Sequence, residues 1–161
     1  MIRLPLRTRD ADLPVALVIS GRLMIRNSSN TCVFSLSGVE VAFGQATNTY
    51  LGQHSGQGGG LLAHNVGNLT ISKVRFADNY AHQGGAALYL DPWPGGVAVI
   101  EDSAFVSNDI DSGVAGGGGA ITGSFGGLLS VLRCLFIDNS AGNPGTGVSD
   151  DGQGGAIWVP P

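Results

Sequence analysis

The chain has 161 residues, of which 43% are hydrophobic and only 12% are charged. This composition excludes a disordered polyelectrolyte and suits one domain with a hydrophobic core. The net charge is −4, with only eight lysines and arginines, so there is no basic stripe to release counterions and we expect no nucleic-acid partner. No apolar run approaches the roughly 20 residues of a membrane-spanning helix, so we expect no transmembrane segment in this chain.

The first 33 residues contain two predicted strands, Val15–Ile19 and Leu23–Arg26. We interpret residues 1–33 as a degenerate leading coil or N-terminal strands, and residues 34–161 as repeats. The cationic start resembles a signal peptide, but Asp10 and Asp12 interrupt it and no small-residue cleavage site follows. Without a signal, the chain is either cytoplasmic or a piece of a longer secreted chain, and the repeats favour the second.

Three segments of the chain align on a phenylalanine that is followed three residues later by an asparagine. Small or apolar residues stand seven, five and two positions before the phenylalanine in every copy. A weaker copy has Val41 in place of phenylalanine and Gly44 in place of asparagine, and the anchors at 41, 76, 105 and 136 are 35, 29 and 31 residues apart. Such a recurrence predicts a repeat architecture. The three full pairs are Phe76 with Asn79, Phe105 with Asn108, and Phe136 with Asn139.

A glycine motif follows each of these copies, and we align its versions position for position. The segments between the phenylalanine and the glycine pair lengthen along the chain through Ser107–Gly117 and Ser140–Gln153. Insertions of this kind are typical of loops on one face of a stack, so we expect these two loops to form the contact surface. The motifs are Gly84-Gly85-Ala86-Ala87, Gly118-Gly119-Ala120-Ile121 and Gly154-Gly155-Ala156-Ile157, with a degenerate Gly59-Gly60-Leu61-Leu62.

The alternation of apolar residues before each phenylalanine is the period of a β-strand, with a one-residue kink between two short runs. Strands that stack in register predict an all-β fold, a right-handed single-stranded parallel β-helix (solenoid) of about four to five coils. We expect the phenylalanines to fill the core, the asparagines, which tolerate positive φ, to form ladders at a turn, and the glycine pairs to allow a tight bend. A catalytic asparagine triplet is the alternative interpretation of the same column.

The F-x-x-N motif paired with G-G-A-I/L/V resembles the polymorphic outer-membrane-protein repeat, best known from chlamydial surface autotransporters. The resemblance covers about residues 34 to 159, with three good copies and one degenerate copy. It implies a right-handed parallel β-helix at a cell surface that acts in adhesion. It also implies an extracellular, cell-surface or outer-membrane location.

A carbohydrate-active or carbohydrate-binding β-helix of the pectin-lyase-like group is the alternative function. Asp150 and Asp151 are similar to the paired aspartates of polygalacturonases, and Trp93 and Trp158 could stack on sugars. The other polygalacturonase motifs are missing, and the three histidines at 54, 64 and 82 share no spacing. We expect no carboxylate ladder opposite the basic group of Lys73, Arg75 and Arg133.

Four acids in the long loops form the possible binding loop: Asp109, Asp111, Asp150 and Asp151. Calcium needs six to eight oxygen ligands and no calcium-binding nonapeptide is present, so we expect no metal and no cofactor. Cys32 and Cys134 would lie about 15 Å apart, too far for a disulfide, and we expect both to be buried thiols. We therefore expect a non-catalytic surface or extracellular protein, a fragment of a larger chain, that binds a cell-surface protein or a glycan.

Overall fold

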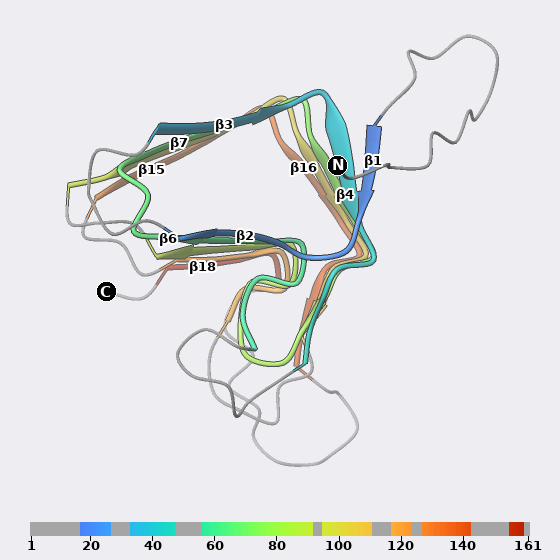
Figure 1. The fold of residues 1–161 in the computed structure, drawn as a ribbon. Coiled ribbons are helices and arrows are strands. Elements are labelled where there is room, and N and C mark those ends of the chain that lie inside the picture. The colour runs from blue at the N-terminus through green and yellow to red at the C-terminus, as the bar shows by residue number, and fades with distance from the viewer. Residues whose placement is uncertain are drawn as a thin grey trace, which may run out of the picture.

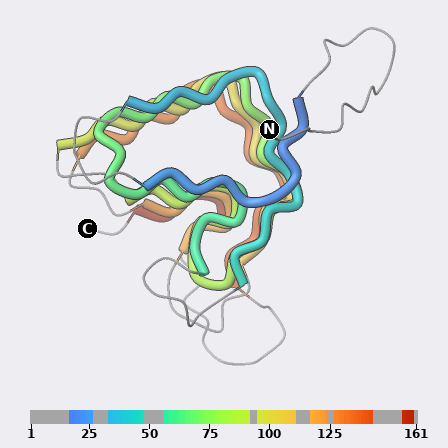
Figure 2. The backbone as a smooth tube through the Cα atoms, viewed as in Figure 1, coloured from blue at the N-terminus to red at the C-terminus, as the bar shows by residue number. Residues whose placement is uncertain are grey.

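The chain is a parallel β-helix with four stacked sheets, seen down its axis in the computed structural model of Figures 1 and 2. The structure describes residues 17–26, 33–47, 56–91, 95–110, 117–123, 127–142 and 155–159. In this view the chain runs clockwise as it recedes from blue to red, so the coil is right-handed (Figures 1 and 2). The predicted fold class is confirmed.

Each complete coil passes through the four sheets in the same order, which we number 1 to 4. Sheets 1 and 2 meet at a corner. Sheet 1 contains the residues that precede the phenylalanine anchor, and sheet 2 contains the anchor itself. The strands of sheet 1 are β3 (Val33–Ser37), β7 (Asn68–Ser72), β11 (Val97–Glu101) and β15 (Leu128–Leu132). Those of sheet 2 are β1 (Leu17–Ser20), β4 (Val39–Ala42), β8 (Arg75–Ala77), β12 (Ala104–Val106) and β16 (Leu135–Ile137).

The chain then leaves the core along a short arm, sheet 3, and returns through sheet 4 (Figure 1). The two-residue strands of sheet 3 are β5 (Gln45–Ala46), β9 (Tyr80–Ala81), β13 (Asp109–Ile110) and β17 (Ser140–Ala141). The strands of sheet 4 are β2 (Leu23–Arg26), β6 (Leu61–His64), β10 (Leu88–Asp91), β14 (Ile121–Gly123) and β18 (Ile157–Trp158). We number the coils 1 to 4, beginning at β3, β7, β11 and β15.

The leading segment adds a half coil before coil 1. The strand β1 pairs in parallel with β4, and β2 pairs with β6. The first predicted strand, Val15–Ile19, corresponds to β1 at Leu17–Ser20, with residues 15 and 16 outside the described residues, and the second has the predicted bounds. The described residues thus form four coils and this half coil, within the predicted range.

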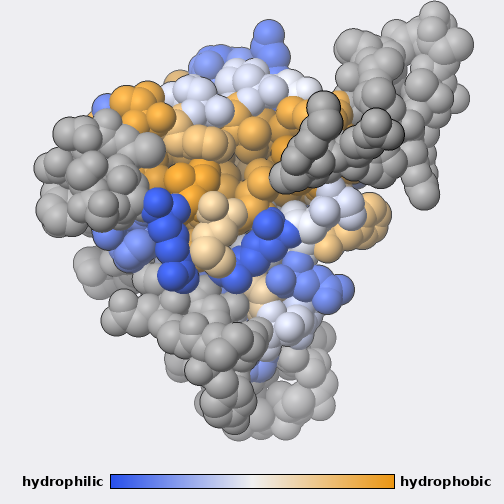
Figure 3. Space-filling view, viewed as in Figure 1, coloured by the Kyte–Doolittle hydropathy of each residue, from blue (hydrophilic) through white to orange (hydrophobic). Residues whose placement is uncertain are grey.

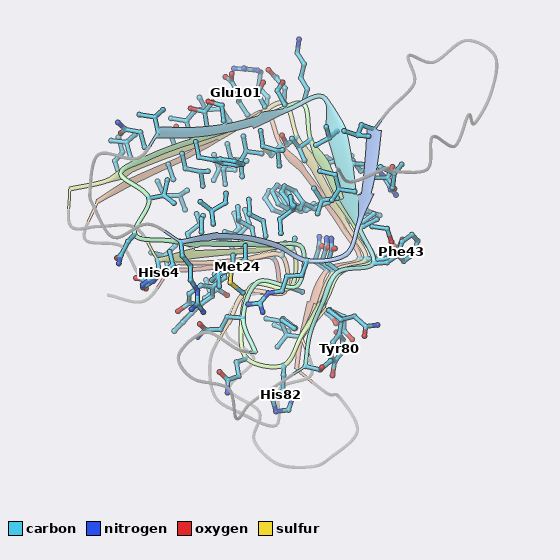
Figure 4. All side chains as sticks on the ribbon, viewed as in Figure 1. Met24, Phe43, His64, Tyr80, His82 and Glu101 are labelled. Carbon is cyan, nitrogen blue, oxygen red and sulfur yellow. The ribbon has the colours of Figure 1, made fainter. Side chains whose placement is uncertain are left out.

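The core is built from columns of equivalent side chains, as Figure 4 shows inside the coil. Phe76, Phe105 and Phe136 are register partners, and their rings stack with centroids 5.1 and 4.9 Å apart. The first two rings are completely buried. A parallel ladder repeats at about 4.8 Å, so identical rings one coil apart fall naturally at stacking distance.

Two columns of left-handed residues turn the corners on either side of sheet 2. The first column, between sheets 1 and 2, has φ from 50 to 67°, and the second, between sheets 2 and 3, has φ from 50 to 57°. Asparagine was expected to supply the positive φ, but the residue directly before it does so. A left-handed residue reverses the side-chain alternation and bends the strand without interrupting the stack. The columns are Gly38, Lys73, Asp102 and Arg133, then Phe43, Asp78, Ser107 and Asp138.

The end of the coil that faces the viewer in Figure 3 is apolar at its centre. Partly buried residues of the half coil and coil 1 pack there against the core, among them Ile19, Phe34 and Leu36. Beneath them the core cluster continues through coils 2 and 3. Packing between neighbouring coils therefore supplies the hydrophobic stabilisation of this fold.

Candidate functional site

The asparagines of the repeat form a continuous amide ladder beside the phenylalanine column. Asn79 Nδ2 donates to Asn108 Oδ1 at 2.9 Å, and Asn108 Nδ2 donates to Asn139 Oδ1 at 2.8 Å. Each Nδ2 group also donates to the carbonyl of the anchor residue in the preceding coil, at 3.1, 3.2 and 2.9 Å for Asn79, Asn108 and Asn139. Each Oδ1 accepts a backbone N–H from the preceding coil, so that Gly44 donates to Asn79, Asn79 to Asn108 and Asn108 to Asn139.

This ladder gives the asparagines a structural role. Asn79 and Asn108 are 1% and 0% exposed, and their amides are occupied by the neighbouring coils. A buried amide that uses both its donor and its acceptor rigidifies its surroundings and is costly to remove. These two side chains are therefore out of reach of a substrate.

The glycine motifs do not stack in the alignment made from the sequence. Leu61, Leu88, Ile121 and Ile157 form one register column. Consequently Gly85, not Gly84, lies level with Gly118, so the motif of coil 2 is shifted by one residue. The degenerate motif of coil 1 is shifted by one residue in the other direction. The apolar column that fills the interior determines the register, whereas the glycine letters can move by one position within the loop.

The glycines that do share a column are Gly58, Gly85 and Gly118. A Cβ on any of them would collide with the carbonyl oxygen of the residue three positions later, which is Leu61, Leu88 or Ile121. Gly154 lies outside the described residues, and Gly155 lies just before β18. The column permits the close backbone approach where the chain turns from the arm into sheet 4.

Ion pairs join neighbouring coils across the outer surface of sheets 1 and 2. Arg133 Nε donates to Asp102 Oδ1 at 2.6 Å, and its Nη2 lies 3.1 Å from Glu101 Oε2. Arg75 Nη1 lies 3.0 Å from Glu40 Oε1. The expectation that no carboxylates face these cations is wrong, because register stacking places residues 31 to 35 positions apart side by side.

The Arg133 pair has a clear electrostatic signature. The hydrogen bond from Arg133 lowers the pKa of Asp102, and the same bond raises the pKa of Arg133. Both groups are solvent-exposed, so the pair contributes little to stability and weakens with salt.

A second polar cluster lies on the outer side of sheet 4, where Figure 4 labels Met24 and His64. His64 Nδ1 lies 2.7 Å from Asp91 Oδ2, and Asn65 Nδ2 lies 3.2 Å from His64 Nε2. Arg26 and Asp91 are the register partners of His64 on its two sides. Arg26, His64 and Asp91 are 27 or more positions apart, so no local motif predicts this cluster, and its one signal in the sequence is their shared position at the ends of aligned strands.

Two further side chains border this polar cluster. Burial raises the pKa of Tyr89, and the nearby Asp91 adds to the effect. Arg22 donates from Nη2 to Gln57 O at 2.6 Å and from Nε to Gly58 O at 3.0 Å, and burial followed by Arg26 lowers its pKa. Arg22 thus ties the half coil to the turn that precedes β6.

The predicted binding loop is only partly within the described residues. Asp109 is exposed on the arm and accepts a hydrogen bond from Ser140 Oγ. Asp111, Asp150 and Asp151 lie outside the described residues, as do Trp93, His54 and Cys32. Within the described ranges, no group of three or more histidine, cysteine or acidic residues could hold a metal ion.

The remaining sequence candidates are dispersed. His82 lies at the end of the arm, away from His64 (Figure 4). Cys134 is a free thiol in the last coil and is partly exposed, where a buried thiol was expected. Its Sγ lies 3.3 Å from Leu132 O. A cavity of about 10 Å³ is lined by six apolar residues and could hold at most about one water.

The last coil carries the complete motif in the order seen in coils 2 and 3: Phe136, Asn139 and the glycine motif before Ile157. Residues 133–160 match the Chlamydia polymorphic membrane protein repeat. In the described part of the chain, coil 3 stacks in register on the coil that contains this match, and coil 2 stacks in register on coil 3. No curated protein and no solved structure matches the chain. No helix among the described residues has the length and apolarity to cross a membrane.

Proposed function

We propose that the chain is a non-catalytic β-helix segment of a cell-surface or extracellular protein, with an adhesive or structural role. The observation that carries this proposal is the match of coil 4 to the Chlamydia polymorphic membrane protein repeat, in register with the two coils before it. The repeat is named for membrane proteins, and resemblance to it favours a surface location.

The distribution of side chains supports a scaffold role. The repeated residues point into the coil and are buried, as with Phe105, Asn108 and Ile121. The outer positions differ from coil to coil, as with Glu40, Arg75, Ala104 and Leu135 in one register column of sheet 2. An interior that repeats from coil to coil, with an exterior that varies, suits a surface that presents different contacts on one frame.

An adhesion assay tests this proposal. Beads coated with the purified chain should adhere to cultured epithelial cells more than beads coated with albumin. A variant with residues 111–116 and 143–153, which lie within the two predicted contact loops, replaced by glycine and serine of equal length should lose adhesion while keeping its circular dichroism spectrum and Tm. A folded chain that adheres no more than albumin would contradict the adhesive role and leave the structural one.

A carbohydrate-binding or carbohydrate-active β-helix is the second candidate, supported by the cluster of Arg26, His64 and Asp91 beside Tyr89. Charged, imidazole and phenol groups on one face are suited to hydroxyl-rich ligands. A glycan array and a polygalacturonate turnover assay decide between the candidates. Glycan binding or turnover that is lost in Asp91→Asn, with normal folding, would favour this second function over the first.

A further inference from the structure

Asn68 is an exposed asparagine inside the stack, at the start of β7 in sheet 1. Its register partners are Val33 in the coil before it and Val97 in the coil after it. A described strand therefore lies on each side of Asn68, and its exposure reflects a side chain that points outward from the coil.

The packing of the coil does not explain an asparagine at this position. The repeat asparagines Asn79 and Asn108 are 1% and 0% exposed and belong to the amide ladder. The side chain of Asn68, by contrast, makes no hydrogen bond to another described residue. Asparagine is also a poor strand former, and valine stands at the equivalent positions of the two neighbouring coils.

The residues after Asn68 complete a modification motif. Asn68-Leu69-Thr70 has the form Asn-X-Ser/Thr, the acceptor of N-linked oligosaccharides. Residues two positions apart share one face of a strand, and both Asn68 and Thr70 are exposed while Leu69 between them is buried. No other asparagine in the described ranges has serine or threonine at this spacing. The motif and the exposed amide therefore coincide at one site.

The surface around Asn68 leaves room for a sugar. The two flanking valines are short, and the adjacent outer column contains Ser35, Thr70 and Val99, none of them charged. Sheet 1 also lies on the opposite side of the coil from the arm (Figure 1). An oligosaccharide on Asn68 would therefore leave the arm uncovered.

We propose that Asn68 is the acceptor of an N-linked oligosaccharide, which stands on the outer surface of sheet 1. This inference rests on the proposed extracellular location, because such sugars are added to secreted chains. Asn68 Nδ2 forms a bond to the anomeric carbon of an oligosaccharide carried on a lipid pyrophosphate. The bond from that carbon to the pyrophosphate oxygen breaks, the lipid pyrophosphate leaves, and Nδ2 releases one proton.

The direction of the side chain decides whether a modified chain can fold. An oligosaccharide on Asn68 extends into solvent and replaces no contact of the core. The same group on Asn79 would break the amide ladder and would have to occupy buried space. Only the first modification is compatible with the closed coil.

Secretion of the full chain from cultured mammalian cells, behind an added signal sequence, tests the proposal. Asn27→Gln is introduced first, because Asn27-Ser28-Ser29 has the same form and lies outside the described residues. Treatment with peptide N-glycosidase should remove the mass of one oligosaccharide and leave aspartate at position 68 in peptide mass spectra. Asn68→Gln and Thr70→Ala should each abolish this mass shift.

Ala81→Ser is the matched control, since it gives the buried Asn79 the same motif through a small change. With Asn27→Gln and Asn68→Gln also present, the folded, secreted chain should carry no oligosaccharide. An oligosaccharide on Asn79 of folded protein would overturn the proposal, because exposure would then not select the site.

Two other results would also overturn the proposal. These are a folded, secreted chain without a glycan on Asn68, and secretion that occurs only when Asn68 is replaced. Because the signal sequence is added, either result concerns Asn68 alone. A lack of adhesion in the bead assay would count against the proposed adhesive role and leave the glycan result unchanged.

Discussion

In the amide ladder, a single buried side chain makes hydrogen bonds to several other buried groups. Asn108 is completely buried, bonds both neighbouring asparagines and binds the carbonyl of Phe76. Removing its amide leaves several buried groups without partners at once. Because such groups cannot turn to water, the loss exceeds that of one ordinary hydrogen bond.

Asn108→Ala should lower the free energy of unfolding by about 3 kcal/mol, as measured by urea denaturation. Asn68→Ala is the matched control, because Asn68 is an exposed asparagine in a strand of sheet 1, and it should cost less than about 0.5 kcal/mol. If Asn108→Ala lowered the free energy of unfolding no more than Asn68→Ala does, the hydrogen bonds of the amide ladder would not be stabilising.

The Arg133–Asp102 pair predicts a dependence on pH. The folded-state pKa of Asp102 is lowered by its hydrogen bond from Arg133. Its contribution is therefore present above the ordinary carboxyl pKa and is lost as pH falls through the lowered value. Asp102→Asn, which keeps the shape and tolerates the left-handed φ, should slightly lower Tm at pH 7 and low salt. The difference should vanish near pH 2 and in 1 M NaCl.

Asp78→Asn is the control for that measurement. Asp78 also occupies a left-handed corner, at φ 53°, and has no basic partner among the described residues. The difference in Tm between Asp78→Asn and the parent chain should be the same at pH 7 and at pH 2. A similar pH-dependent loss in both variants would mean that the pair is not its source.

At the scale of the strand, the glycine column before sheet 4 and the left-handed corners beside sheet 2 restrict side chains for different reasons. Gly38 has φ 67° but open space around it, and its column equivalents in coils 2 to 4 carry full side chains. Gly85 has φ 54° and would also drive a Cβ into Leu88 O. A side chain at Gly38 would therefore meet only the strain of a positive φ. A side chain at Gly85 would meet that strain and a collision with the backbone as well.

Gly38→Ala should therefore cost about 1 kcal/mol from the left-handed φ alone. Gly85→Ala should cost at least about 2 kcal/mol more, because the neighbouring backbone has to move. Equilibrium unfolding of the two variants measures the difference directly. Equal costs would show that the backbone at the turn into sheet 4 moves away from an added Cβ at little cost. The glycines of this column would then be needed only for their positive φ.

At the scale of the whole molecule, stability depends on neighbours, because each described strand pairs with the equivalent strands of the coils next to it. Phe105 has a ring stacked on both sides, whereas Phe136 has one and is partly exposed. The end coil should therefore be less stable than the centre and should open more often.

Phe105→Ala should cost about 3–5 kcal/mol, the range for a buried phenylalanine that leaves a cavity. Phe136→Ala should cost about half as much. Amide hydrogen exchange should show lower protection in β16 than in β12 of the parent chain. Equal costs and equal protection would contradict a nearest-neighbour stack and indicate that something covers coil 4.

Much of this architecture could be predicted from the sequence. The phenylalanine and asparagine columns could be aligned by eye, because parallel in-register stacking places equivalent letters one coil apart. The strands, the fold class and the approximate number of coils followed from that period. The leading strands were visible as apolar runs, although the first ends one residue later than predicted.

The tertiary structure decided the features that depend on contacts between coils. The glycine motifs slide by one residue because the interior Leu61, Leu88 and Ile121 column controls register. The cluster around His64 and the pairs of Arg75 and Arg133 join residues that no local motif connects. The sequence alone determined which residues recur and hence the columns of the coil, since a repeat needs only its period. Only the tertiary structure decided which outer side chains meet, because that depends on the length of every loop between them.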